Sequence, residues 1–228
     1  MGALSKILSG GFTIETMLAL FAALFIIFCV SPLHEYAHAF TAYKLGDRTA
    51  KFQGRLTLNP LAHIDPLGAL MILLVGFGYA KPVPVNMRNF PRQKRKLYMG
   101  ITALAGPMSN IIMALIMSIL CCLFYKLYYK ASGNIYFYYL TMFFSYAAII
   151  NISLAVFNFL PIPPLDGSRI TNAILPDKYY YKIMQYEQFI RIGLFVLIYI
   201  GVLDKPLSIA VDFVYDGLFN IASAIVGL

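Results

Sequence analysis

Long apolar runs separated by short polar and basic segments dominate the chain. A membrane-spanning helix needs about 20 mainly apolar residues, and residues 14–43, 100–125 and 135–160 each provide such a run. No charged residue lies within 16–33, 100–125 or 131–165. The pattern therefore predicts three core transmembrane helices.

The C-terminal pattern predicts one or two further helices. Residues 188–203 and 206–228 are mostly apolar, with Asp204 and Lys205 as a polar turn between them. Asp212 and Asp216 interrupt the last run. The last helix is therefore also compatible with a position partly in the membrane interface.

A shorter apolar segment, residues 67–80, contains several glycines and lacks the length of an ordinary span. The prolines in the next five residues, 81–85, favour extended backbone. We expect a short re-entrant or β-hairpin segment here.

Composition supports a membrane protein. Of 228 residues, 60% are hydrophobic and 12% charged, and the mean hydropathy is +0.73; soluble domains carry about 25% charged residues. The net charge of +8 does not indicate nucleic-acid binding, because the cations lie mostly in loops between apolar runs. We expect an all-α polytopic membrane protein with a single domain, residues 1–228.

The distribution of cations predicts an orientation. Lys44, Arg48, Lys51 and Arg55 follow the first apolar run, and Lys81, Arg88, Arg92, Lys94, Arg95 and Lys96 precede the second. Because cytoplasmic loops are enriched in Lys and Arg, residues 44–99 are expected in the cytoplasm and the N-terminus outside. Residues 67–80 must then enter and leave the membrane on one face.

The first run carries the residues His34, Glu35 and His38 near its C-terminal end. An H-E-x-x-H spacing places two imidazoles on one helix face, where both can bind one zinc ion, with the glutamate beside them as a base. A polar cluster that only packs helices together is the alternative, but ionisable groups in a membrane helix are costly and usually functional.

Asp166 is the strongest candidate for a third ligand. It follows a proline-rich break after the third core helix, and the predicted orientation brings this break to the same membrane side and depth as His34 and His38. A carboxylate there can complete a zinc site of three protein ligands. Alternatively, Asp166 forms a turn or caps a helix.

These motifs together resemble the site-2 protease family of intramembrane zinc metalloproteases, peptidase family M50. The H-E-Y-A-H sequence at 34–38 and the N-F-L-P-I-P-P-L-D-G sequence at 158–167 carry the resemblance, with further similarity at 59–68 and 105–110. The similar region covers about residues 25–175. The chain looks like a compact form, without the PDZ or CBS domains of some members.

The resemblance implies an intramembrane zinc endopeptidase that cleaves in or near transmembrane segments of membrane-protein substrates. His34, His38 and Asp166 would hold one Zn²⁺ per chain, Glu35 would be the general base, and Asn158 would help to bind the substrate strand. We expect a multi-pass protein of the cell membrane, with its active site towards the cytoplasm and the lipid bilayer and a transmembrane substrate as its partners. The sequence leaves the oligomeric state open.

Several roles stay open at this point. His63 and Asp65 are either parts of the second ligand sphere, substitute ligands or hydrogen-bonding parts of a loop. Asn158 could instead satisfy backbone groups near the proline break. A membrane zinc hydrolase for another class of substrate and a metal-binding transporter are the alternative functions.

Overall fold

The computed structural model describes residues 7, 11–75 and 80–228. Its elements are helices, and no strand lies within this part of the chain. Four of its helices are long and apolar enough to cross a membrane: Thr16–Lys44, Arg92–Lys130, Ile135–Phe159 and Asp204–Val226. The all-helical prediction is confirmed, and the first three spans coincide with the predicted core helices.

The first span is one continuous rod made of three elements. Helix α2 (Ile14–Phe25) begins with a capping box between Thr13 and Thr16. It passes into a π-helical turn, η1 (Ile26–Val30), and then into α3 (Ser31–Lys44). A π turn holds one more residue than an α turn. The apolar pattern predicted the span but not this turn.

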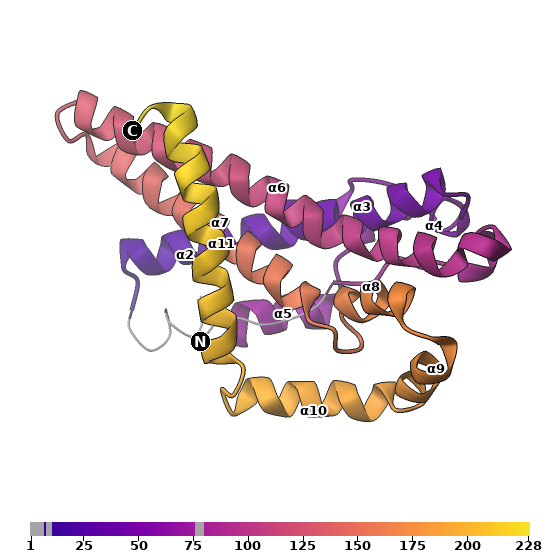
Figure 1. Ribbon diagram of the computed structural model, residues 1–228. Coiled ribbons are helices and arrows are strands. Elements are labelled where there is room, and N and C mark those ends of the chain that lie inside the picture. Colours follow the sequence, from indigo (N-terminus) through magenta and orange to yellow (C-terminus); the bar gives the residue numbers. More distant parts are fainter. Residues whose placement is uncertain (1–6, 8–10, 76–79) are drawn as a thin grey trace.

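Helices α6 (Arg95–Lys130) and α7 (Ile135–Phe159) form the long antiparallel pair of the core (Figure 1). Small buried residues, including Ala114 on α6 and Ala147 and Ala148 on α7, let the two backbones approach closely. Helix α6 extends beyond the predicted run at both ends. Its added residues include Lys96 and Lys126, whose long stems can lie along an apolar surface while the ammonium groups stay outside it.

The connection between α3 and α6 contains α4 (Thr49–Phe52), the single turns η2 (Pro60–Ala62) and η3 (Met87–Asn89), η4 (Arg92–Lys94) and α5 (Pro66–Val75). With ten residues, α5 is about 15 Å long, half the thickness of a bilayer core. The predicted re-entrant or hairpin segment is thus helical in its first part, and the predicted β-hairpin is not found in the described residues. Residues 76–79 lie outside them.

The C-terminal part contains α8 (Asp166–Ile174), α9 (Asp177–Gln185), α10 (Glu187–Tyr199) and α11 (Asp204–Val226). Helix α11 crosses α6 and α7 (Figure 1) and is a candidate span. Helix α10 has only thirteen residues and does not reach that length. The predicted polar turn at Asp204 and Lys205 is wrong, because these residues form the first turn of α11.

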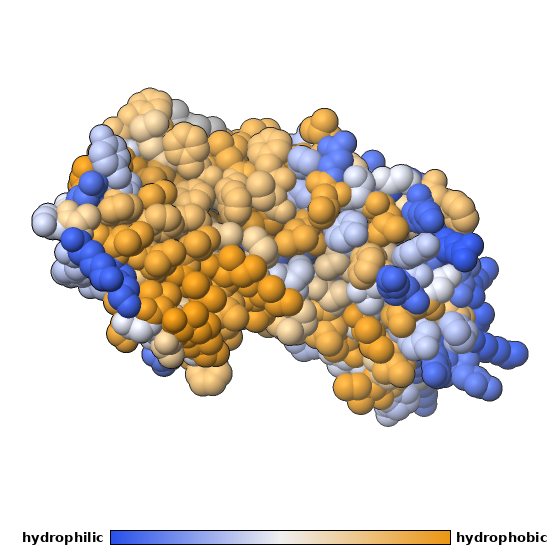
Figure 2. Space-filling model, turned by 90° about the horizontal axis from the view of Figure 1, so that it is seen from above, coloured by the Kyte–Doolittle hydropathy of each residue, from blue (hydrophilic) through white to orange (hydrophobic). Residues whose placement is uncertain are grey.

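The surface follows the same division. Figure 2 shows apolar side chains over most of the visible face, with hydrophilic residues at both ends and the larger group at the end that carries α4 and the start of α6. Helices α3 and α8 reach this same end of the bundle (Figure 1). The molecule thus has an apolar belt between two hydrophilic ends, as expected of a membrane protein.

Candidate metal centre

Three side chains meet between α3 and α8. His34 and His38 lie one turn apart on α3, and Asp166 is the first residue of α8. The Nε2 atoms of the two histidines are 3.1 Å apart, and Asp166 Oδ2 lies 3.1 Å from His38 Nε2 and 3.3 Å from His34 Nε2. Within the described residues this is the one group of three or more potential metal-binding side chains.

The triangle of ligand atoms fits a tetrahedral metal ion. Ligands bound to zinc at about 2.0–2.2 Å lie about 3.3 Å or slightly more from one another, close to the separations observed here. His38 Nδ1 lies 2.7 Å from the carbonyl oxygen of Thr102 and must donate to it, so a neutral His38 directs the lone pair of Nε2 at Asp166. A proton on His38 Nε2 can form a hydrogen bond to only one of the other two ligand atoms. A cation at the centre of the triangle can bind all three ligand atoms.

Helix α6 passes directly behind the imidazoles because residue 106 is glycine. A Cβ atom at Gly106 would lie 2.2 Å from His38 Nε2 and 2.6 Å from His34 Nε2. Any side chain there would fill the space next to the ligand atoms. No pattern in the sequence indicates that the close neighbours of Gly106 are the two histidines.

Helix α8 is held against the bundle so that its first residue faces the histidines. Lys96 donates to the carbonyl of Leu175 at the C-terminal end of α8, at 3.0 Å. Gly100 on α6 leaves room for Ala173, since a Cβ at residue 100 would lie 2.7 Å from the Cβ of Ala173. These contacts fix the helix that carries Asp166.

The Asp166 carboxylate faces the imidazoles rather than capping its own helix. Leu165 is the N-cap residue of α8, without a side-chain cap. Burial raises the pKa of Asp166, but when the facing imidazoles are protonated, their charge and their hydrogen bonds outweigh burial and hold the pKa of Asp166 well below its usual range. The carboxylate is therefore ionised, as a metal ligand must be.

Glu35 is buried and has a specific partner outside the cluster. Its Oε2 atom accepts a hydrogen bond from the backbone N–H of Val83, at 2.9 Å. Val83 belongs to the extended chain between α5 and α6. This contact joins the first span to a loop more than forty residues away, and no sequence pattern pointed to it.

The remaining predicted site residues have partners of their own. His63 Nε2 lies 2.7 Å from the Thr57 carbonyl, and Asp65 accepts from the N–H of Gly68 at 2.9 Å at the start of α5. These are the contacts of a hydrogen-bonded loop, and neither residue joins the cluster. The Asn158 amide donates to the Leu154 carbonyl one turn back on α7, at 2.9 Å, so its substrate role stays a prediction.

Comparison with known proteins places the chain in a family. The model of peptidase family M50 matches residues 20–200. YwhC of Bacillus subtilis, named as a candidate zinc metalloprotease, is 44% identical over 173 residues, which cover 75% of this chain and 78% of YwhC. Rip2 of Mycolicibacterium smegmatis, named likewise, is 32% identical over 142 residues, 59% of this chain and 50% of Rip2.

No solved structure matches the chain significantly. The family match and the identity to YwhC confirm the predicted resemblance and the predicted enzyme class, a zinc metalloprotease. The chain belongs to peptidase family M50.

Proposed function

We propose that this protein is an intramembrane zinc endopeptidase that hydrolyses peptide bonds in or near the transmembrane segments of other membrane proteins. The observation that carries the proposal is the triangle of His34, His38 and Asp166 ligand atoms, with sides of 3.1–3.3 Å, which lies where the uncharged stretch 16–33 of the first span ends. Ionisable side chains within a membrane segment are energetically costly, and such residues usually have a function.

The three side chains would hold the zinc ion, and Glu35 would act as the base. Zinc, when bound, supplies Lewis acidity towards the substrate carbonyl and towards water. Glu35 accepts a proton from the attacking water and passes it to the nitrogen of the departing amine. His38 keeps its orientation through the Thr102 carbonyl on α6, because that contact determines which ring nitrogen carries the proton.

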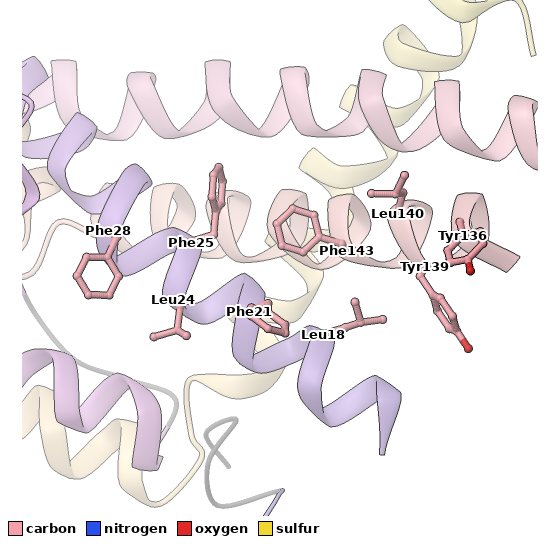
Figure 3. Close-up of a pocket in the computed structure, with 9 residues that line it drawn as sticks. All are labelled: Leu18, Phe21, Leu24, Phe25, Phe28, Tyr136, Tyr139, Leu140 and Phe143. Atoms are coloured by element: carbon pink, nitrogen blue, oxygen red, sulfur yellow. The ribbon is translucent and has the colours of Figure 1, made fainter. Parts of the chain in front are cut away.

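An open apolar groove supports a membrane-embedded substrate. It has a volume of about 760 Å³ and lies between the first span and α7 (Figure 3). Its lining is Leu18, Phe21, Leu24, Phe25, Phe28, Tyr136, Tyr139, Leu140 and Phe143. None of these residues belongs to the metal cluster, but η1 connects the groove directly to α3. An apolar segment of a substrate could therefore lie close to the site.

The charge distribution supports an active site that faces the cytoplasm. Helices α3 and α8, which carry the ligands, reach the end of the bundle where the basic segments lie (Figures 1 and 2). The described part of α5, Pro66–Val75, is shorter than a span, which agrees with a segment that enters and leaves on one face. We infer a multi-pass protein of the cell membrane with its N-terminus outside.

A reconstituted protein with labelled single-span peptides tests the proposal. We expect Glu35→Gln to keep zinc and to lose cleavage by at least about 100-fold, because general-base catalysis contributes about that much or more. Zinc content is measured by atomic absorption on the same samples. Undiminished cleavage by the variant would remove Glu35 as the base.

The substrate panel separates the alternatives. Cleavage of soluble peptides at the same rate as single-span peptides would favour a membrane hydrolase with another substrate class. Zinc flux into vesicles that does not depend on Glu35 would favour a transporter.

A further inference from the structure

Residues 81–86, called the strap below, connect Glu35 to a second buried charge. The strap lies between α5 and η3 and has neither helical nor strand structure. Val83 is buried against Ala39 and Ala50, and its N–H donates to Glu35 Oε2. The orientation of the Glu35 carboxylate therefore depends on where the strap holds this N–H.

Arg55 holds the strap from the other side. Its Nη2 atom donates to the carbonyl oxygens of Lys81 and Pro82, the latter at 3.4 Å. Arg55 is 7% exposed, and the ion pairs among the described residues do not include it. Burying a guanidinium group without a carboxylate partner costs desolvation free energy. The hydrogen bonds from Arg55 to the two carbonyl oxygens must offset this cost, which an exposed arginine does not have.

The two contacts meet on a single peptide unit. The Pro82 carbonyl that accepts from Arg55 and the Val83 N–H that donates to Glu35 belong to the same planar amide. A donor on the oxygen of an amide polarises it and strengthens the hydrogen bond from its N–H. The arginine and the glutamate are thus coupled through one rigid plane.

Few other hydrogen bonds of the strap can position the Pro82–Val83 amide. Pro82 and Pro84 have no N–H. The N–H of Lys81 donates to the His63 carbonyl at 2.9 Å, and the N–H of Asn86 donates to Asp47 at 2.7 Å. These bonds anchor the two ends of the strap, so the middle depends on Arg55 and on the packing of Val83.

We propose that Arg55 is a positioning residue for the catalytic base, acting on Glu35 through the Pro82–Val83 peptide unit. The inference rests on the proposed role of Glu35. Arg55 touches neither the three ligands nor the space between them, as far as the described contacts show. Its loss should therefore impair turnover while zinc stays bound.

The test compares Arg55→Lys and Arg55→Gln with the parent and with Arg92→Gln, which alters an exposed arginine in η4. We expect both Arg55 variants to lose kcat on a labelled single-span peptide by about 10- to 100-fold, the usual range for residues that orient a catalytic group from behind. KM and zinc content should stay at the parent values. The Arg92 variant should match the parent throughout.

Hydrogen exchange supplies a readout that does not depend on activity. The amide of Val83 should exchange faster in both Arg55 variants, whereas the amides of α7 should not change. Unchanged exchange at Val83 would overturn the proposal, as would faster exchange with an undiminished kcat. A parallel loss of zinc and thermal stability would mean that Arg55 only stabilises the fold.

Free guanidinium added to Arg55→Ala should restore part of the lost kcat if the missing group is the donor itself. If guanidinium does not restore kcat in a folded, zinc-loaded variant, the loss of kcat is not due to the missing hydrogen-bond donor of Arg55. If the parent does not cleave the peptide, the proposed function fails. The exchange experiment would still decide whether Arg55 positions the strap.

Discussion

His38 is fixed by groups from three helices. It projects from α3, donates through Nδ1 to a carbonyl of α6, and meets Asp166 of α8 through Nε2. Each contact removes one degree of freedom of the ring. The imidazole is therefore oriented before any metal arrives, which lowers the entropic cost of binding.

Gly106→Ala tests the space behind the two imidazoles. The new methyl group would lie 2.2 Å from His38 Nε2, so the rings or α6 must move. We expect loss of zinc and of cleavage, measured by metal analysis and peptide assay. Gly193→Ala is the matched control, because a Cβ there has no neighbour within 4 Å; loss of zinc in both variants would refute the steric explanation.

Asp47 provides a pH-dependent contribution to stability. Burial alone would raise its pKa, but hydrogen bonds from Thr49, Asn89 and Asn86 outweigh burial and lower the pKa below 3.8. A carboxylate with a lowered pKa stabilises the fold above its unfolded pKa and loses this effect as the pH falls.

We therefore expect Asp47→Asn to lower the free energy of unfolding by about 2 kcal/mol at pH 7, the usual value for hydrogen bonds to a charged group. The difference from the parent should shrink as the pH falls below 3.8. Thermal melts in detergent between pH 3 and pH 7 measure it. A constant difference over this range would contradict the assignment, and Asp212→Asn, on the exposed side of α11, serves as the control.

At the residue scale, the sequence predicted the groups whose chemistry is local. Two histidines at a spacing of four must share a helix face, and a proline break must end a helix before Asp166. It could not predict Thr102, which acts through its backbone carbonyl, or Arg55, whose partners are also backbone atoms. Every residue has a backbone carbonyl, so the identity of a residue does not indicate that its carbonyl makes such a contact.

At the scale of the elements, the position of α8 matters for metal binding, because its first residue, Asp166, must lie next to the histidines of α3. Gly100→Ala would place a methyl group 2.7 Å from the Cβ of Ala173, and neither carbon can rotate away. We expect α8 to shift and the zinc affinity to fall by about 10- to 100-fold, as when other supports of a metal ligand are removed. Competition with a fluorescent chelator measures this affinity.

A second substitution distinguishes the clash from a general loss of packing. The double variant Gly100→Ala, Ala173→Gly removes the clashing Cβ and should recover most of the affinity. If the double variant binds zinc no better than Gly100→Ala, the contact between these two residues is not what positions α8.

The sequence predicted elements according to their length and uniformity. Each of the three core spans contains a long uncharged stretch, and the spans lie where the apolar runs predicted them. Helices α8 and α9 are short, and their polar faces resemble loops in sequence. The π turn η1 is invisible to an apolar pattern because every residue in it is apolar.

At the scale of the whole molecule, the orientation in the membrane is the main open prediction. Single cysteines at Gln93 and Ser132, both exposed and at opposite ends of α6, can report it after Cys29→Ala removes the exposed native thiol. We expect a membrane-impermeant maleimide to label residue 93 only in inside-out vesicles and residue 132 only in intact cells. The reverse pattern would place the active site outside.

The extra residue in η1 has a consequence for insertions and deletions. Each residue in an α-helix advances the direction of the side chains by about 100°, but the π turn between α2 and α3 fits one more residue into a single revolution. Deleting one residue from Ile26–Val30 would convert the bulge into ordinary helix. Because a π turn and an α turn each complete one revolution, the groove-lining face of α2 would keep its direction relative to His34 and His38. Deleting a residue from α2 itself would instead rotate the N-terminal part of this face by about 100°, and an apolar segment bound there would no longer be aligned with the metal ligands.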